Sequence, residues 1–295
     1  MSDVALDAEA IAHGTQGTPL ELLSRIPALQ PFVPSDILLT PEAWELLWTR
    51  RRRGAFAGRG GNPATTKELR ELGLLTLAGG ASPAGIALTR ARTSSRLSFG
   101  ALTQSAGRRM TFSSWYSGSN ALVAAEVLNG DGTTSISVHD TSRSAGLGLL
   151  LSWLRIGPAW TYGHDIGDGE YDAELIEERI AAAPGSEPPV PEDASWVTRR
   201  AWTSGEWARC EIISPSAKLV TARIRTGDVG WFDVEELPNG RVRLIPALSY
   251  DVMCDVIGTF HESRTKSADR LARSQPRGIS GAVARFREAS VPDEG

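Results

Sequence analysis

The side chains best suited to metal binding or nucleophilic catalysis are widely separated in this sequence. The four histidines and two cysteines are His13, His139, His164, His261, Cys210 and Cys254. No pair of them has the His-x-x-x-His or Cys-x-x-Cys spacing that places two ligands on one zinc ion. The sequence therefore contains no local indication of a metal site.

One acidic stretch has residue types that could hold a cation. His164 and Asp165 are followed by Asp168, Glu170 and Asp172. These acids lack the ordered ligand spacing of a calcium-binding loop. The pattern is more typical of a solvated acidic loop.

Glycine-rich and serine motifs of common enzymes are also missing. Residues 58–61 (Gly-Arg-Gly-Gly) follow a basic helix end instead of a strand, and they lack the Lys-Ser/Thr close of a phosphate-binding loop. No Gly-x-Ser-x-Gly elbow is found. We therefore predict a protein that is not an enzyme and has no catalytic residue, cofactor or metal. Catalytic residues that converge only in space are the remaining alternative.

Aromatic residues favour a binding role. Nine tryptophans occur in 295 residues. Trp160 with Tyr162, and Trp231 with Phe232, lie in stretches that could be exposed, where aromatic side chains suit protein recognition. For any single one of them, core packing is the favoured role.

Charge is unevenly distributed along the chain. The net charge of −4 predicts no strong bulk attraction to nucleic acid or to an acidic membrane. Residues 50–109 contain twelve Arg/Lys and two acids, whereas residues 163–193 contain ten acids and one base. The two segments could attract each other or two partner faces, and the alternative is a pair of solvated surfaces.

The remaining bulk features predict a cytoplasmic protein. The first twelve residues are acidic and lack a signal-peptide pattern. The apolar run at 147–154 is too short to span a bilayer. Cys210 and Cys254 lie in apolar patterns, which predicts two buried free thiols without a disulfide framework.

The first third of the chain predicts an irregular segment followed by short helices. Residues 1–35 carry four prolines that break any long helix. Residues 37–39 read as a strand, and Thr40 and Pro41 read as the cap and first residue of a helix. A second helix is expected from about residue 65 with three inward leucines, Leu69, Leu72 and Leu75. A third is expected to begin at Ser82 and Pro83.

Two later regions share one pattern of strands followed by a helix. They span about residues 110–155 and 207–262, with Asn-Gly turns at 129–130 and 239–240. Between them we expect an exposed acidic helix at 172–180 and a stiff, solvated, proline-rich linker at 184–195. In the tail at 263–295, a helix could dock through Ile279, Val283 and Phe286.

A DNA-binding interpretation is the alternative for the basic segment. A helix at 65–72, the leucines that follow it, Gly79-Gly80 and residues 84–89 resemble the end of a winged-helix module. The second helix carries only two bases, Lys67 and Arg70, together with two acids. A clear recognition helix is missing, so a transcriptional regulator remains the second interpretation.

The order of elements resembles the EspG family, the cytosolic chaperones of ESX (type VII) secretion systems. The resemblance lies first in Ile37-Leu38-Leu39-Thr40-Pro41-Glu42-Ala43-Trp44, a short strand and a tryptophan-containing helix, and then in Leu72-Gly73-Leu74-Leu75. It continues in Val229-Gly230-Trp231-Phe232 and Asn239-Gly240-Arg241-Val242. In the order of its elements, the resemblance covers roughly residues 36–262. The long N-terminal segment and the acidic loop at 163–193 depart from the family pattern.

The resemblance implies an α+β fold and a protein client. The expected fold is a quasi-two-fold pair of antiparallel strand-plus-helix halves, at 36–183 and 196–262, forming a central sheet with flanking helices. The implied function is binding a helical-hairpin export substrate of PE–PPE or WxG type and keeping it soluble. No local motif transfers the family's binding residues. On physical grounds we nominate four aromatic or apolar side chains in the polar acidic loop as partner-binding candidates: Trp160, Tyr162, Ile166 and Tyr171.

Overall fold

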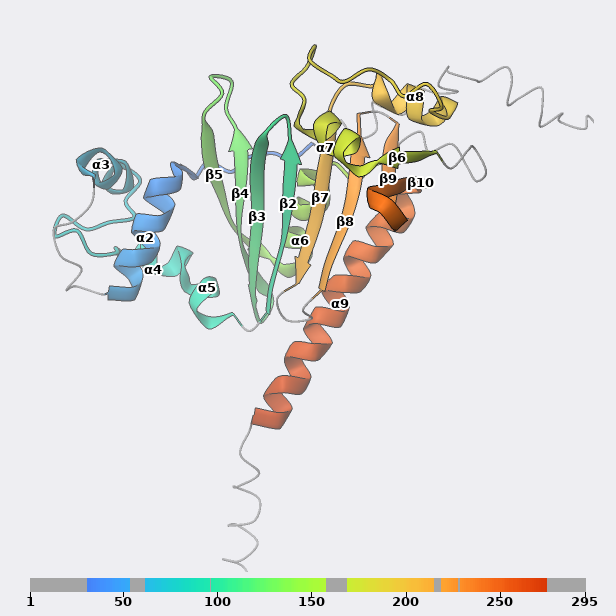
Figure 1. Cartoon of the computed structure of the whole chain (residues 1–295). Helices are drawn as coiled ribbons and strands as arrows, with labels where there is room; N and C mark the ends of the chain where they lie inside the picture. The colour runs from blue at the N-terminus through green and yellow to red at the C-terminus, as the bar shows by residue number, and fades with distance from the viewer. Residues whose placement is uncertain are drawn as a thin grey trace, which may run out of the picture.

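The computed structural model contains one ten-stranded antiparallel sheet with helices on both faces (Figure 1). The structure describes residues 31–53, 62–95, 97–157, 169–214, 219–227 and 229–274. The strand order is β1-β5-β4-β3-β2-β7-β8-β9-β10-β6. The chain is therefore α+β, as the sequence predicts.

The strands come in two consecutive groups of four long strands, β2 to β5 and β7 to β10, and one short strand, β1 or β6, precedes each group. They are β1 (Leu38–Leu39), β2 (Leu97–Ser105), β3 (Arg108–Ser117), β4 (Asn120–Leu128), β5 (Thr134–Ser142), β6 (Glu170–Asp172), β7 (Trp207–Ser214), β8 (Leu219–Thr226), β9 (Gly230–Leu237) and β10 (Arg241–Ala247). The described helices are α2 (Pro41–Arg53), α3 (Pro63–Glu71), α4 (Pro83–Leu88), α5 (Arg90–Ser94), α6 (Arg143–Trp153), α7 (Ala173–Ala181), α8 (Trp196–Trp202) and α9 (Ser249–Ser274).

Side-chain caps fix where most of these helices begin. Thr40 accepts a hydrogen bond from the Ala43 N–H at the start of α2, and Ser82 accepts one from the Gly85 N–H at the start of α4. Ser142 and Ser195 cap α6 and α8 in the same way. Each cap satisfies an N–H that the first helical turn leaves without an intrahelical partner. The predicted starts at Thr40 and Ser82 are confirmed.

The sheet buries three clusters of apolar residues. One cluster lies between the sheet and the helices α6 and α9, and it includes Phe99, Phe112, Leu150 and Phe260. On the opposite face, α2, α4 and α5 cover β4 and β5. The helices α7 and α8 cover β7 to β10 on that same face. The second face is therefore covered by two separate groups of helices, which lie toward the two ends of the sheet (Figure 1).

We call this second face the open face. Because side chains alternate along a strand, it contains the even-numbered residues of β2 and the odd-numbered residues of β3 and β7. Trp115 of β3 packs with the cluster under α2, and Trp207 of β7 packs with the cluster under α7 and α8. The central strand pair β2–β7 joins the two strand groups into one sheet, with Gly100 opposite Ile213.

Several predicted exposures are wrong. The sequence pattern predicts Leu72 to face inward, but it lies past the last residue of α3 and is 41% exposed. By contrast, Trp231 and Phe232 are buried, as the core-packing interpretation predicts, because β9 is an interior strand with helices on both faces. Cys254 is exposed, because Val252, Val256 and Phe260 form the buried stripe of α9 and Cys254 lies outside it.

The acidic helix also differs from its prediction. Its bounds agree with α7, but Ile176, Arg179 and Ile180 are buried against β7 and β8. The Arg179 guanidinium donates to the backbone oxygens of Trp202 and Gly205. Only the acidic side of α7 faces solvent.

The proline-rich segment at 184–195 packs against the protein more than a solvated linker would. The Trp202 indole N–H donates to the Pro188 carbonyl, and Ala194 is buried in the cluster under α8. The helix α8 that follows is absent from the sequence-based expectation. Among the described residues, no helix is both long and apolar enough to cross a membrane. The proposed tail helix at Ile279, Val283 and Phe286 lies outside the described residues.

Candidate functional site

The centre of the open face is arranged by strand register. Leu102 of β2 lies between Thr111 of β3 and Glu211 of β7. In the next row, Gly100 lies between Ser113 and Ile213. Small side chains therefore meet at the middle of the face, and larger ones border it.

These rows line an open cavity of about 270 Å³. Its lining on the open face comes from β2, β3 and β7 and consists of Ser98, Gly100, Leu102, Arg109, Thr111, Ser113, Trp115 and Ile213. Leu102 is 4% exposed and forms the floor, whereas Arg109 is exposed at one rim. We call this cavity and its rim the central groove.

Gly100 gives the groove its flat floor. A Cβ atom at this position would lie 2.7 Å from the Phe112 carbonyl oxygen, closer than non-bonded atoms approach. Any other residue would therefore push β2 and β3 apart. The missing side chain also leaves space above the backbone at the centre of the cavity.

The two helix groups border the groove at diagonally opposite corners. At one corner, α5 is tied to β3 by a 2.9 Å hydrogen bond between the hydroxyls of Ser94 and Ser117. At the other, the Ala106 N–H at the β2–β3 turn donates to the Ile180 carbonyl of α7, at 2.8 Å. These two corners are the ends of one diagonal of the groove. The other diagonal runs from Arg109 toward Ile213.

An aromatic cluster fixes Trp115 at the border of the groove. The Arg92 guanidinium carbon lies 3.9 Å from the ring centroid of Trp48, 4.7 Å from that of Trp115 and 5.5 Å from that of Trp44. Stacking a guanidinium on indole faces is favourable and orders both groups. Trp115 is therefore held in place before any partner binds.

Charges at the groove are of both signs. No ion pair joins Arg109 or Glu211 to another residue of the described part of the chain. Glu126, beside them on β4, accepts the Thr111 N–H. Arg209 pairs with Glu177 of α7. Arg109 and Glu211 are thus the charges at this surface that a partner could engage.

The binding residues nominated from the sequence lie elsewhere. Trp160, Tyr162 and Ile166 are outside the described residues. Tyr171 lies on β6 and is 2% exposed, and its hydroxyl accepts the Ser195 N–H at 3.4 Å. In this conformation its ring belongs to the core under α7 and α8.

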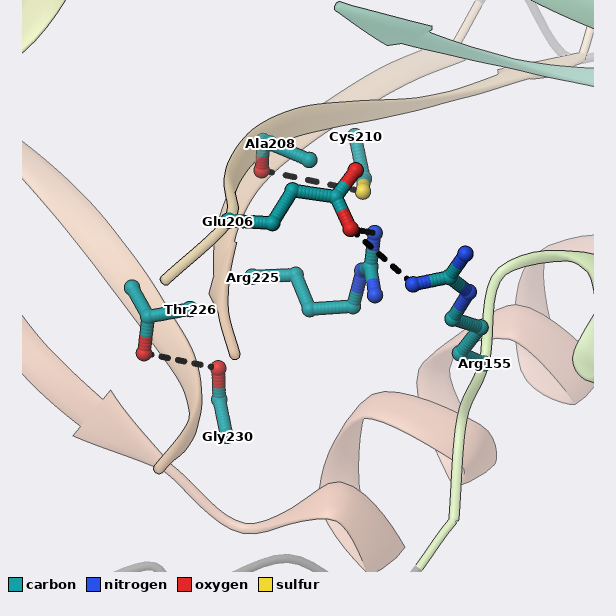
Figure 2. A network of polar contacts seen from close by, with 7 residues as sticks. All are labelled: Arg155, Glu206, Ala208, Cys210, Arg225, Thr226 and Gly230. Atoms are coloured by element: carbon teal, nitrogen blue, oxygen red, sulfur yellow. Dashed lines mark hydrogen bonds and ion pairs between the residues drawn. The ribbon is translucent and has the colours of Figure 1, made fainter. Parts of the chain in front are cut away.

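A second polar cluster lies on the other face. Figure 2 shows Arg155 and Arg225 converging on the carboxylate of Glu206, at 2.9 and 3.4 Å. Cys210 lies beside them, fully buried, and its Sγ is 3.8 Å from the Ala208 carbonyl. Burial raises the pKa of this thiol to about 11, so it is protonated at neutral pH and unsuited to nucleophilic attack.

The described residues include no group of three or more His, Cys, Asp and Glu side chains placed to hold a metal ion. Neither the groove nor the Glu206 cluster combines a nucleophile with a base that could activate it. What the groove offers is shape, a fixed indole and two charges of opposite sign. These are features of a binding surface.

Sequence reasoning missed the groove residues for an identifiable reason. Residues 89–107 contain β2, and their Ser/Thr/Arg-rich composition matched no element. The available signal was the alternation of Leu97, Phe99 and Ala101 with small residues, which indicates a strand buried on one face. No known family model matches the chain, and no curated protein matches it.

Proposed function

We propose that this protein is a non-enzymatic cytosolic chaperone or adaptor. Its client would be a helical-hairpin substrate of type VII secretion, of PE–PPE or WxG type, which it keeps soluble for export. The observation that carries the proposal is the central groove, an uncovered strip of sheet between two groups of helices. A helical segment of a client can cover this strip.

The dimensions of the groove suit one helix. Its side walls are β3 and β7, which lie on either side of β2. Two strand spacings amount to about 10 Å, which is close to the diameter of an α-helix with its side chains, about 10 Å. A partner helix that crosses β2 would cover Leu102 and would lie beside Gly100 and Ile213.

The arrangement of the chain supports the EspG-like fold. In chain order, β1 and α2 precede the group β2–β5 and α6, and β6 and α7 precede the group β7–β10 and α9. Each short strand pairs with the last strand of its own group, β1 with β5 and β6 with β10. We infer two quasi-two-fold related halves that meet at the β2–β7 pair.

The structure offers less support for DNA binding. Two bases of the basic segment are used inside the protein, since Arg50 is 6% exposed and Arg92 is stacked on tryptophans. The winged-helix-like residues 65–89 pack through Leu69, Leu74 and Leu75 in the core under α2. A regulator of this kind would bind duplex DNA with a steep salt dependence.

The test is to identify the client. Affinity purification of the tagged protein from its source cell, followed by mass spectrometry and light scattering, should recover a stoichiometric small helical protein with an export-type sequence. Ser113→Trp fills the groove and should lose that protein. Ser119→Trp, in the exposed β3–β4 turn, should retain it. Recovery of the wild-type chain alone or with DNA would refute the proposal.

A further inference from the structure

The groove is chemically asymmetric along its open diagonal. Arg109 of β3 and Glu211 of β7 point to the same face and lie on either side of Gln104 and Leu102 of the central strand. The α5 and α7 corners occupy the other diagonal. A rod-shaped partner could therefore lie from Arg109 across β2 toward Glu211 and Ile213, with one charge at each side of β2.

The register sets the separation of these charges. Arg109 lies in the row of Gln104, and Glu211 lies in the adjacent row of Leu102, two strands away. In an ideal sheet, two strand spacings and an offset of two residues separate their Cα atoms by about 12 Å. An α-helix rises that distance in about eight residues, and residues seven or eight apart lie on the same side of a helix.

We propose that the central groove takes one amphipathic helix of a protein partner, laid from Arg109 to Glu211, with an acid and a base about two turns apart on the docking face. Small and apolar side chains of the helix between the two charges rest on Leu102 and Thr111, beside Gly100 and Ile213 in the next row. The acid meets Arg109, and the base meets Glu211. This inference rests on the proposed protein-binding function and specifies the helix that the function requires.

Two neighbouring charged side chains already have partners within the protein. Glu126 is turned toward the Thr111 N–H, and Arg209 is paired with Glu177. Rim charges of this kind contribute modestly to affinity and strongly to the choice of partner. The experiment is therefore built on a ranking of partners.

The probes are stapled helical peptides of 18 residues with one leucine stripe and two charged positions eight residues apart. One carries Glu and Lys, one carries two Glu, and one carries two Lys. A fourth carries Glu and Lys only four residues apart. Because a helix can lie in the groove in either direction, the order of Glu and Lys does not affect the ranking. Affinities for the full chain are measured by fluorescence anisotropy at low and at high salt.

The wild-type chain should bind the Glu/Lys probe about three- to tenfold more tightly than the other three. Arg109→Glu should make the two-Lys probe the best ligand, and Glu211→Lys should make the two-Glu probe the best. Arg108→Glu is the matched control, because Arg108 is exposed on the same strand but faces the opposite side. That variant should keep the wild-type ranking, and all rankings should flatten at high salt.

Three results would overturn the inference. First, Arg109→Glu could rank the probes in the same order as Arg108→Glu. If the client still binds in that case, the proposed function stands but the docking geometry is different. The wild-type chain could bind none of the probes. Light scattering could show a dimer of the chain alone that Ser113→Trp dissociates, which would assign the groove to a second copy. Thermal melting of each variant confirms that it is folded.

Discussion

The guanidinium of Arg92 on α5 lies 3.9 Å above the indole ring of Trp48 on α2. The same guanidinium contacts Trp115 of β3, at 4.7 Å from its ring centroid. One cation therefore connects two helices and the sheet at the border of the central groove. Because Arg92 contacts all three indole rings at this corner, the orientation of the α2–α5 group depends on it.

Arg92→Ala should destabilise the protein and loosen this corner of the groove. Loss of a partly buried cation–π cluster and its packing costs about 1–3 kcal/mol of unfolding free energy. Urea denaturation measures this loss. Arg90→Ala, on the same short helix but exposed, should change stability by less than about 0.5 kcal/mol. Equal effects of the two substitutions would show that the tryptophan contacts contribute nothing.

Gly100→Ala should destabilise the sheet at the floor of the groove. The added Cβ would meet the backbone oxygen of Phe112 at 2.7 Å, and a backbone atom in a paired strand cannot easily move away. Overpacking of this kind costs about 1–3 kcal/mol, measured as a lower denaturation midpoint.

The matched control for this change is Gly148→Ala. Gly148 lies in the middle of α6, is exposed, and has no atom within 4 Å of an added Cβ. Alanine in a helix is favoured over glycine by up to about 1 kcal/mol. The control should therefore stabilise the protein. If both variants gain stability, the close approach of β2 and β3 at Gly100 is not real.

Local sequence signals predicted the elements, and long-range pairing determined the site. Caps such as Ser82 and turns such as Asn239-Gly240 act within a few residues, so they can be identified from the sequence. The pairing of Gly100 with Ile213 joins residues far apart in the chain, and no local pattern specifies it. The groove follows from that pairing and from which helices cover which strands.

The errors in exposure have a similar cause. The acidic neighbours of Arg179 predict a solvated helix, yet its guanidinium finds two backbone carbonyls of the α8–β7 connection. A buried arginine is stable when such acceptors compensate its lost hydration. Those acceptors lie more than twenty residues away in sequence, so composition alone could not reveal them.

The two cysteines should differ sharply in reactivity. Cys254 is exposed and Cys210 is buried, so a disulfide reagent such as Ellman's reagent should modify one thiol rapidly in the folded protein. The second thiol should react only when the chain is unfolded in denaturant. Cys254→Ser should abolish the rapid phase. A rapid phase that survives in Cys254→Ser would place Cys210 at the surface.

Cys210 should also make stability depend on alkaline pH. Burial raises the pKa of its thiol from the ordinary value of 9.0 to about 11, so the folded state holds the proton more tightly than the unfolded state. The resulting stabilisation is fully present below pH 9. It declines by about 1.4 kcal/mol per pH unit as the unfolded thiol ionises, and it is lost as pH rises through about 11.

Comparison with Cys210→Ala isolates this contribution. Other groups that ionise at high pH are present in both proteins, so their effects cancel in the difference. Urea denaturation at pH 8, 9, 10 and 11 should show the wild-type chain losing stability faster than the variant above pH 9, because only the wild-type unfolded chain releases this proton. Parallel curves would mean that the thiol ionises equally in both states. In that case the interior beside Arg225 is more hydrated than the buried position of Cys210 indicates.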